Sequence, residues 1–127
     1  MRAERERKKK LIVAFHFQVA NEQFAGRTGW DCDSCRKHGL DVSRRCGFIA
    51  IEERGASRVV WGRKQVQSVE CPKSFVTGTS LAFLEEFLVR RRLGIPESLE
   101  TEARKIDAFL VLRDQMEREE RDVTTQH

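Results

Sequence analysis

Apolar and polar residues alternate along a stretch near the start of the chain, residues 11–19. Large apolar side chains occupy every second position there: Val13, Phe15, Phe17 and Val19. Ala14, His16 and Gln18 fill the positions between them. A period of two places alternate side chains on opposite faces, so this segment predicts a half-buried β-strand.

A second apolar stretch, residues 47–53, also predicts a strand. Residues 54–57 (Arg-Gly-Ala-Ser) have turn chemistry, and residues 58–61 (Arg-Val-Val-Trp) predict the returning strand of a hairpin. Gly62 predicts a bend or bulge, after which residues 65–70 continue extended. The first half of the chain therefore predicts a small antiparallel sheet.

After Pro72 the apolar residues follow a helical period. Residues 80–93 predict a helix that is capped by Thr79 or Ser80 and ended by Gly94. Its apolar stripe contains Leu81, Phe83, Leu84, Phe87 and Leu88. A second helix is predicted over residues 97–121, with an apolar face of Ala103, Ile106, Phe109, Leu110 and Met116. The short link between the two helices favours a helical hairpin.

These elements predict an α+β fold, in which a small antiparallel sheet with a four-cysteine metal site precedes a C-terminal helical hairpin. We expect one domain over residues 11–127, with a β-rich metal-binding half at 11–72 and a helical half at 73–127. Residues 1–10 carry six basic and two acidic side chains. We expect them to form a disordered basic arm.

The cysteines are the clearest candidate for chemistry. Cys32 and Cys35 are separated by two residues, which lets both sulfurs face one ion, and Cys46 and Cys71 flank the predicted hairpin on the same side. With 39% hydrophobic and 35% charged residues, the chain has a thin core that a bound metal would strengthen. Zinc accepts four thiolates without a geometric preference of its own, so the sequence predicts a structural zinc site.

Other uses of these thiols stay open. Four thiolates also bind iron–sulfur clusters, and Cys71-Pro72 resembles the end of one ferredoxin pattern. Disulfides, a redox pair at Cys32 and Cys35, or unrelated buried cysteines are further alternatives. His38 is either a substitute ligand or an exposed loop histidine.

The net charge of +4 is unevenly placed. The arm alone contributes +4, residues 11–96 another +4, and residues 97–127 contribute −4. A divalent metal with four thiolates would add about −2, so a basic pI does not by itself indicate nucleic-acid binding. Candidate partner-binding residues are Trp30, Arg44, Arg45, Trp61, Arg90, Arg91 and Arg92. Alternatively, the tryptophans cover the core and the three consecutive arginines end a helix and pair with acids.

The sequence contains no recognisable catalytic set, phosphate loop or membrane span, and Glu4 and Glu6 do not fit a signal peptide. We therefore expect a non-enzymatic cytoplasmic protein with no membrane partner. Cytoplasmic thiols stay reduced, which favours a metal over disulfides.

Residues 71–74, 80–87 and 90–94 together resemble small proteins of phage and prophage genomes, some from the tail-assembly region. Glu102 to Leu110 adds to this resemblance, which implies an assembly or accessory factor that acts through protein contacts in the host cytoplasm. The sequence thus predicts a zinc-stabilised protein-binding or assembly protein. A nucleic-acid-binding zinc protein that uses the basic arm, and an iron–sulfur redox or sensor protein, remain the alternatives.

Overall fold

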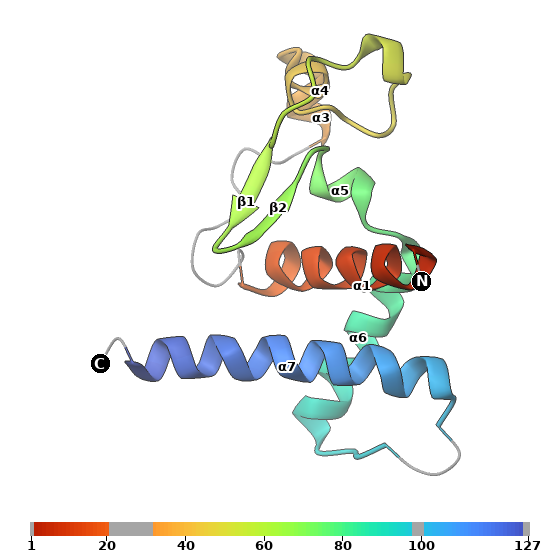
Figure 1. The fold of residues 1–127 in the computed structure, drawn as a ribbon, viewed down its shortest axis with the longest axis vertical. Helices are drawn as coiled ribbons and strands as arrows, with labels where there is room; N and C mark the ends of the chain where they lie inside the picture. The colour runs from red at the N-terminus through yellow and green to blue at the C-terminus, as the bar shows by residue number, and fades with distance from the viewer. Residues whose placement is uncertain (1, 21–31, 98–100, 126–127) are drawn as a thin grey trace. The chain divides into compact units, whose positions relative to one another are not determined.

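The computed structural model describes residues 2–20, 32–97 and 101–125 (Figure 1). The chain divides into two units. Unit 1 consists of Met1–Phe15 and Thr77–His127, and unit 2 consists of His16–Val76. Helices are combined with a small antiparallel sheet, which agrees with the predicted α+β class.

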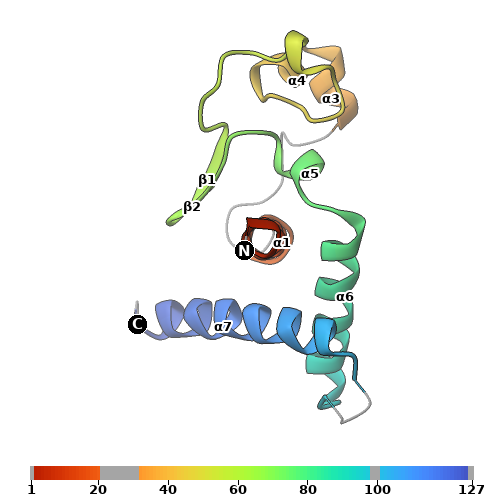
Figure 2. The same cartoon turned by 45° about the vertical axis from the view of Figure 1, so that its right-hand side comes forward.

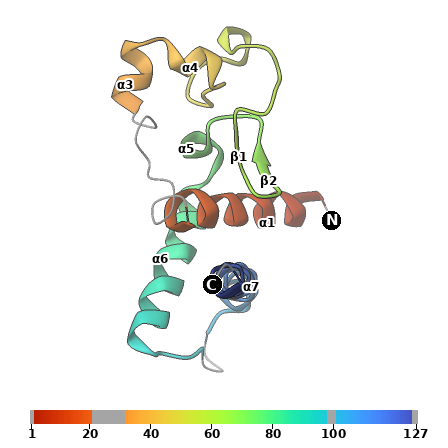
Figure 3. The same ribbon diagram turned by 90° about the vertical axis from the view of Figure 1, so that its left-hand side faces the viewer.

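Unit 1 is built from α1 (Arg2–Phe15), α6 (Gly78–Leu93) and α7 (Ala103–Thr125). Each of these helices packs against the other two, and α6 runs across both α1 and α7 (Figures 2 and 3). Buried apolar side chains from the three helices include Leu11, Leu84, Phe87, Phe109 and Leu112. Two C-terminal helices are therefore present as predicted, but α6 crosses α7 instead of running antiparallel beside it, so the predicted helical hairpin is wrong. The α1 helix packs against both of them.

Local signals define the ends of α6. The Thr77 hydroxyl accepts a hydrogen bond from the Ser80 backbone N–H at 3.1 Å, so Thr77 is the N-cap rather than Thr79 or Ser80 as predicted. Gly94 adopts a left-handed φ of 68° and ends the helix, as predicted. The α7 helix begins at Ala103, later than the predicted residue 97.

Ion pairs join α6 to α7 on the outside of unit 1. Lys105 lies 3.1 Å from Glu86, and Arg91 pairs with Glu120. Arg90 contacts Glu86 at 3.0 Å and lies over the Phe109 ring at 5.7 Å. These contacts agree with the expectation that the arginines at the end of α6 pair with acidic residues.

Unit 2 contains short elements. Helices α3 (Cys32–Lys37) and α4 (Leu40–Ser43) pack on each other, and η2 (Ile51–Glu53) is a single 3₁₀ turn. Strands β1 (Trp61–Arg63) and β2 (Val66–Ser68) pair antiparallel, with Gly62 opposite Gln67, and α5 (Pro72–Phe75) follows (Figure 3).

The prediction of a strand over residues 11–19 is wrong. This segment is the end of α1 followed by the π-helical turn η1 (His16–Ala20). Ala14 and His16 are as buried as Val13 and Phe15, so the segment has no polar face. A helix that is buried all round has no helical period to read, and the basic residues before it have high helix propensity.

Residues 2–10 form part of α1 rather than a disordered arm. These residues therefore belong with the helical unit, and the division between units falls after Phe15 and after Val76 instead of at residue 72. Among the helices that the structure describes, none is long and apolar enough to cross a membrane.

The predicted hairpin of residues 47–53 with 58–61 is also wrong. Residues 47–53 form turns and η2, and the observed hairpin turns at Lys64 and Gln65. Side-chain hydrogen bonds stabilise the turns of residues 47–53. The Arg54 guanidinium donates to the carbonyls of Gly47 and Ile49, which a sheet ladder would otherwise use.

Candidate metal centre

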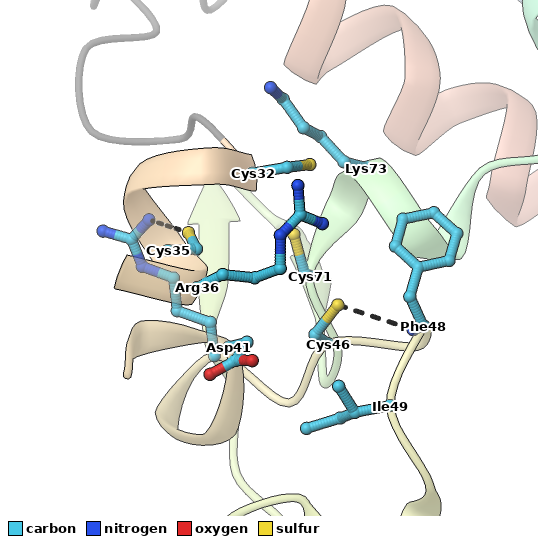
Figure 4. Close-up of a pocket in the computed structure, with 10 residues that line it drawn as sticks. Cys32, Cys35, Arg36, Asp41, Cys46, Phe48, Ile49, Cys71 and Lys73 are labelled. Carbon is cyan, nitrogen blue, oxygen red and sulfur yellow. Dashed lines mark hydrogen bonds between the residues drawn. The ribbon is translucent and has the colours of Figure 1, made fainter. Parts of the chain in front are cut away.

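All four cysteines line one pocket in unit 2, a cavity of about 120 Å³ (Figure 4). Cys32 and Cys35 lie on α3 three residues apart, which places them on the same face of that helix. Cys46 follows α4, and Cys71 is the N-cap of α5. Segments that are distant in sequence thus bring the predicted ligands together.

The four thiols are free, and two of them are withdrawn from solvent. Cys35 and Cys71 are each 8% exposed, whereas Cys32 and Cys46 are half-buried. A free, buried thiol is a common core residue on its own. Four of them around one small cavity form a set of soft ligands.

Backbone N–H groups are directed at two of the sulfurs. Phe48 N–H donates to Cys46 Sγ at 3.4 Å. Burial raises the pKa of the Cys71 thiol, and backbone N–H groups of Lys73 and Ser74 partly oppose this rise. The nearby Cys46 and Cys35 raise the same pKa further. N–H donors around a sulfur stabilise its thiolate, which is the form that binds a metal.

Two arginines add positive charge to the pocket. Arg44 Nη1 donates to Cys35 Sγ at 3.2 Å. Arg36 also lines the pocket, although its side chain is 64% exposed (Figure 4). The pKa of Arg36 is raised chiefly by its hydrogen bond to Asp33 and also by Cys32 and Cys46. These cations favour thiolates and would offset the negative charge of a four-thiolate metal site.

The turns that carry Cys46 and Cys71 are joined to each other. Gly47 N–H donates to Ser74 Oγ at 2.7 Å, and Ser74 Oγ donates to the Cys71 carbonyl at 2.9 Å. A Cβ on Gly47 would lie 2.8 Å from Ser74 Oγ and 3.0 Å from Ser74 Cβ, so the close approach of these two turns favours glycine. The sequence reasoning overlooked Ser74, whose position three residues after Cys71 was the available signal.

The pocket supplies the right donors, but its sulfurs are not in the arrangement of a formed site. Among the residues that the structure describes, no three Cys, His, Asp or Glu side chains are grouped closely enough to hold a metal ion. The four thiols, the N–H donors and the arginines nevertheless fit a thiophilic cation such as zinc.

Other residues singled out from the sequence have different surroundings. Trp61 is 7% exposed and packs edge-on against Phe17 with 5.6 Å between ring centroids, so it belongs to the core of unit 2. Arg45 donates to the carbonyls of Val69 and Gly55 instead of lining the pocket. His38 is exposed and does not line the pocket. Trp30 lies outside the described residues.

Arg90, Arg91 and Arg92 lie in unit 1, where Arg90 and Arg91 make the ion pairs described above and Arg92 is exposed.

Comparison with known proteins gives no family for this chain. No protein-family model, no curated protein and no solved structure matches it.

Proposed function

We propose that Cys32, Cys35, Cys46 and Cys71 bind one zinc ion and that the chain works as a metal-stabilised protein-binding module. The observation that carries this proposal is the shared pocket of all four thiols, supplied by three separate segments of unit 2. Short elements with few buried apolar side chains gain folding free energy from such a metal.

The surroundings of the sulfurs support zinc through charge. The complex of zinc with four thiolates carries about −2. Arg44 contacts Cys35, and Arg36 is close to Cys32 and Cys46, so two cations are in place to balance that charge. The N–H groups around Cys46 and Cys71 would orient their sulfurs.

A zinc ion with four protein ligands has no open position for water or substrate. The proposed site is therefore structural, and the protein acts by binding. The resemblance of residues 71–74, 80–87, 90–94 and 102–110 to phage-encoded proteins extends this proposal to an assembly or accessory role.

The proposal is tested by purifying the chain without oxygen or chelators and measuring its metals and visible spectrum. About one zinc per chain with no visible band is the expected result. Cys46→Ser and Cys71→Ser should each lose the metal, whereas Ser57→Ala, a change at an exposed serine, should keep it. Iron with absorption at about 400 nm would establish the iron–sulfur alternative instead, and free thiols without metal would contradict the proposal.

A second candidate, nucleic-acid binding, is favoured by one feature of unit 1. Arg5, Arg7, Lys8 and Lys9 are exposed on α1. Replacing these four residues with glutamine should abolish any binding to a labelled oligonucleotide, and the binding should weaken steeply with salt. Binding that is indifferent to salt and to these changes would exclude this use of α1.

A further inference from the structure

Unit 2 displays two large apolar side chains on one loop, residues 46–54, which we call the display loop. Phe48 is 70% exposed and Ile51 is 65% exposed. They are separated by only two residues, and the loop begins at the candidate metal ligand Cys46. Single exposed apolar residues are common on protein surfaces, but two on one short loop beside a site are a candidate for contact with a partner.

Hydrogen bonds within the loop fix its shape. The Arg54 guanidinium donates to the Ile49 carbonyl at 3.1 and 3.2 Å and to the Gly47 carbonyl at 3.3 Å. Its side chain is only 17% exposed and lies 3.7 Å from Glu70. Glu53 N–H also donates to the Ala50 carbonyl at 2.9 Å.

Because of these hydrogen bonds, Phe48 and Ile51 are exposed on a loop whose backbone conformation is already fixed. A preorganised loop loses little conformational entropy when it binds, so each apolar contact contributes more to affinity. Apolar anchors of this kind, held in place before binding, are typical of the residues that dominate protein interfaces.

Charge beside the display loop indicates what the partner carries. Phe48, Arg36, Arg44 and Lys73 line the same pocket (Figure 4). Arg36 is paired with Asp33 at 2.6 Å and Arg44 with Cys35 Sγ. Lys73 forms no ion pair with any residue that the structure describes, so its ammonium is available to a carboxylate outside the chain.

The other side of the loop disfavours nucleic acid. Glu52 and Glu53 are exposed next to Ile51 and would repel the evenly spaced phosphates of a nucleic acid, and they confine any partner carboxylate to the Lys73 end of the loop. An aliphatic side chain such as Ile51 also cannot stack on bases in the way that an aromatic ring does. The observations therefore favour a protein over a nucleic acid as the occupant.

We propose that the display loop is a docking site for a protein segment that offers apolar side chains to Phe48 and Ile51 and a carboxylate to Lys73. This inference rests on the proposed binding function and gives it a location and a partner chemistry. The metal site would anchor the loop through Cys46.

The experiment is a selection of peptides from a random display library on the zinc-loaded full chain, followed by affinity measurements on the selected peptides by fluorescence anisotropy. We expect the selected peptides to share aromatic or aliphatic residues next to Asp or Glu. Phe48→Ser and Ile51→Ser should each weaken binding by roughly tenfold or more. Leu93→Ser, at a 65% exposed residue of α6, is the matched control and should leave affinity unchanged.

Lys73→Glu should weaken the binding of the same peptides. It should strengthen the binding of peptide variants in which the acidic residues are replaced by lysine. Lys37→Glu, at an exposed lysine outside the pocket, should have no such effect. The inference would be overturned if the library yielded basic peptides or no peptides. It would also be overturned if the peptides bound the Phe48 and Ile51 variants as tightly as the unchanged chain, or if a labelled oligonucleotide bound this loop more tightly than they do.

The zinc content of every variant is measured on the same preparations. If the protein holds zinc but its peptides bind the loop variants as tightly as the unchanged chain, the docking site is contradicted and the proposed metal site is not. A chain that lacks zinc but selects loop-dependent acidic peptides would support the docking site and contradict the proposed metal.

Discussion

At the scale of the residue, the protonation state of Cys71 is expected to differ between the metal-free and the zinc-bound protein. Its thiol is buried, and burial raises its pKa above the ordinary value of 9.0, so the metal-free fold favours the neutral thiol. A bound zinc ion reverses that preference, because the metal takes the thiolate.

We expect the two states to respond to pH in opposite directions. Without metal, the raised pKa stabilises the fold below pH 9.0, and this contribution is lost as pH rises toward the raised value. With zinc, protons compete for the thiolates, so apparent zinc affinity falls as pH falls, by about tenfold per pH unit for each proton released. Denaturant unfolding of both forms across pH checks this. The same pH response in both forms would contradict it.

Ser74 is the residue that links the Cys46 and Cys71 turns. Its hydroxyl accepts from Gly47 N–H and donates to the Cys71 carbonyl. We expect Ser74→Ala to weaken zinc binding by roughly tenfold, since residues that orient metal ligands have effects of that order. Competition with a chromogenic chelator measures this, with Ser57→Ala as the exposed control. Unchanged affinity in Ser74→Ala would show that the link does not position the ligands.

At the scale of the element, the local signals in the sequence predicted α6 best. Gly94 ends that helix as expected, and the buried Leu84 and Phe87 belong to the predicted stripe. The segment 11–19 could not be assigned in the same way, because both sets of alternating positions are buried. Segment 47–53 was misassigned because its conformation depends on a side chain outside the apolar run, that of Arg54.

Burial on α7 was also predicted only in part. Phe109 is buried as expected, but Leu110 is 53% exposed, whereas Leu112 is fully buried. Gln115 and Glu119 are buried as well, although they are polar. The face of this helix is determined by its packing against both α1 and α6, and the contact with α1 was not foreseen.

The two ends of α6 allow a matched pair of glycine substitutions. Gly94 has φ of +68°, so Gly94→Ala should destabilise unit 1 by about 1 kcal/mol. Gly78 begins the helix, and a Cβ there would meet nothing within 4 Å. Gly78→Ala should therefore be neutral or stabilising by up to about 0.5 kcal/mol. Thermal unfolding followed by circular dichroism checks both, and equal effects would contradict the assigned left-handed cap.

At the scale of the whole molecule, unit 1 is assembled from both ends of the sequence, and unit 2 is the continuous segment between them. The cysteine spacing predicted one metal site. All four cysteines line one pocket, but among the described residues no three ligand side chains are grouped closely enough to hold an ion, so the site itself stays a prediction. The spacing could not predict the connections around the cysteines, because the contacts of Arg44, Arg54 and Ser74 depend on how the turns fold.

The division into units leads to a prediction about metal removal. Unit 1 holds its core between α1, α6 and α7, whereas the candidate ligands all lie in unit 2. We expect a strong chelator to increase amide hydrogen exchange over residues 32–76 while residues 78–93 and 103–125 stay protected. Uniform loss of protection in both units would contradict a metal role confined to unit 2.

The most direct test of the central claim is X-ray absorption at the zinc edge of the full chain, purified without oxygen. The account predicts one zinc ion surrounded by four sulfur atoms at about 2.3 Å. A shell that contains nitrogen or oxygen in place of sulfur, or a chain that binds no zinc, would contradict a site formed by Cys32, Cys35, Cys46 and Cys71.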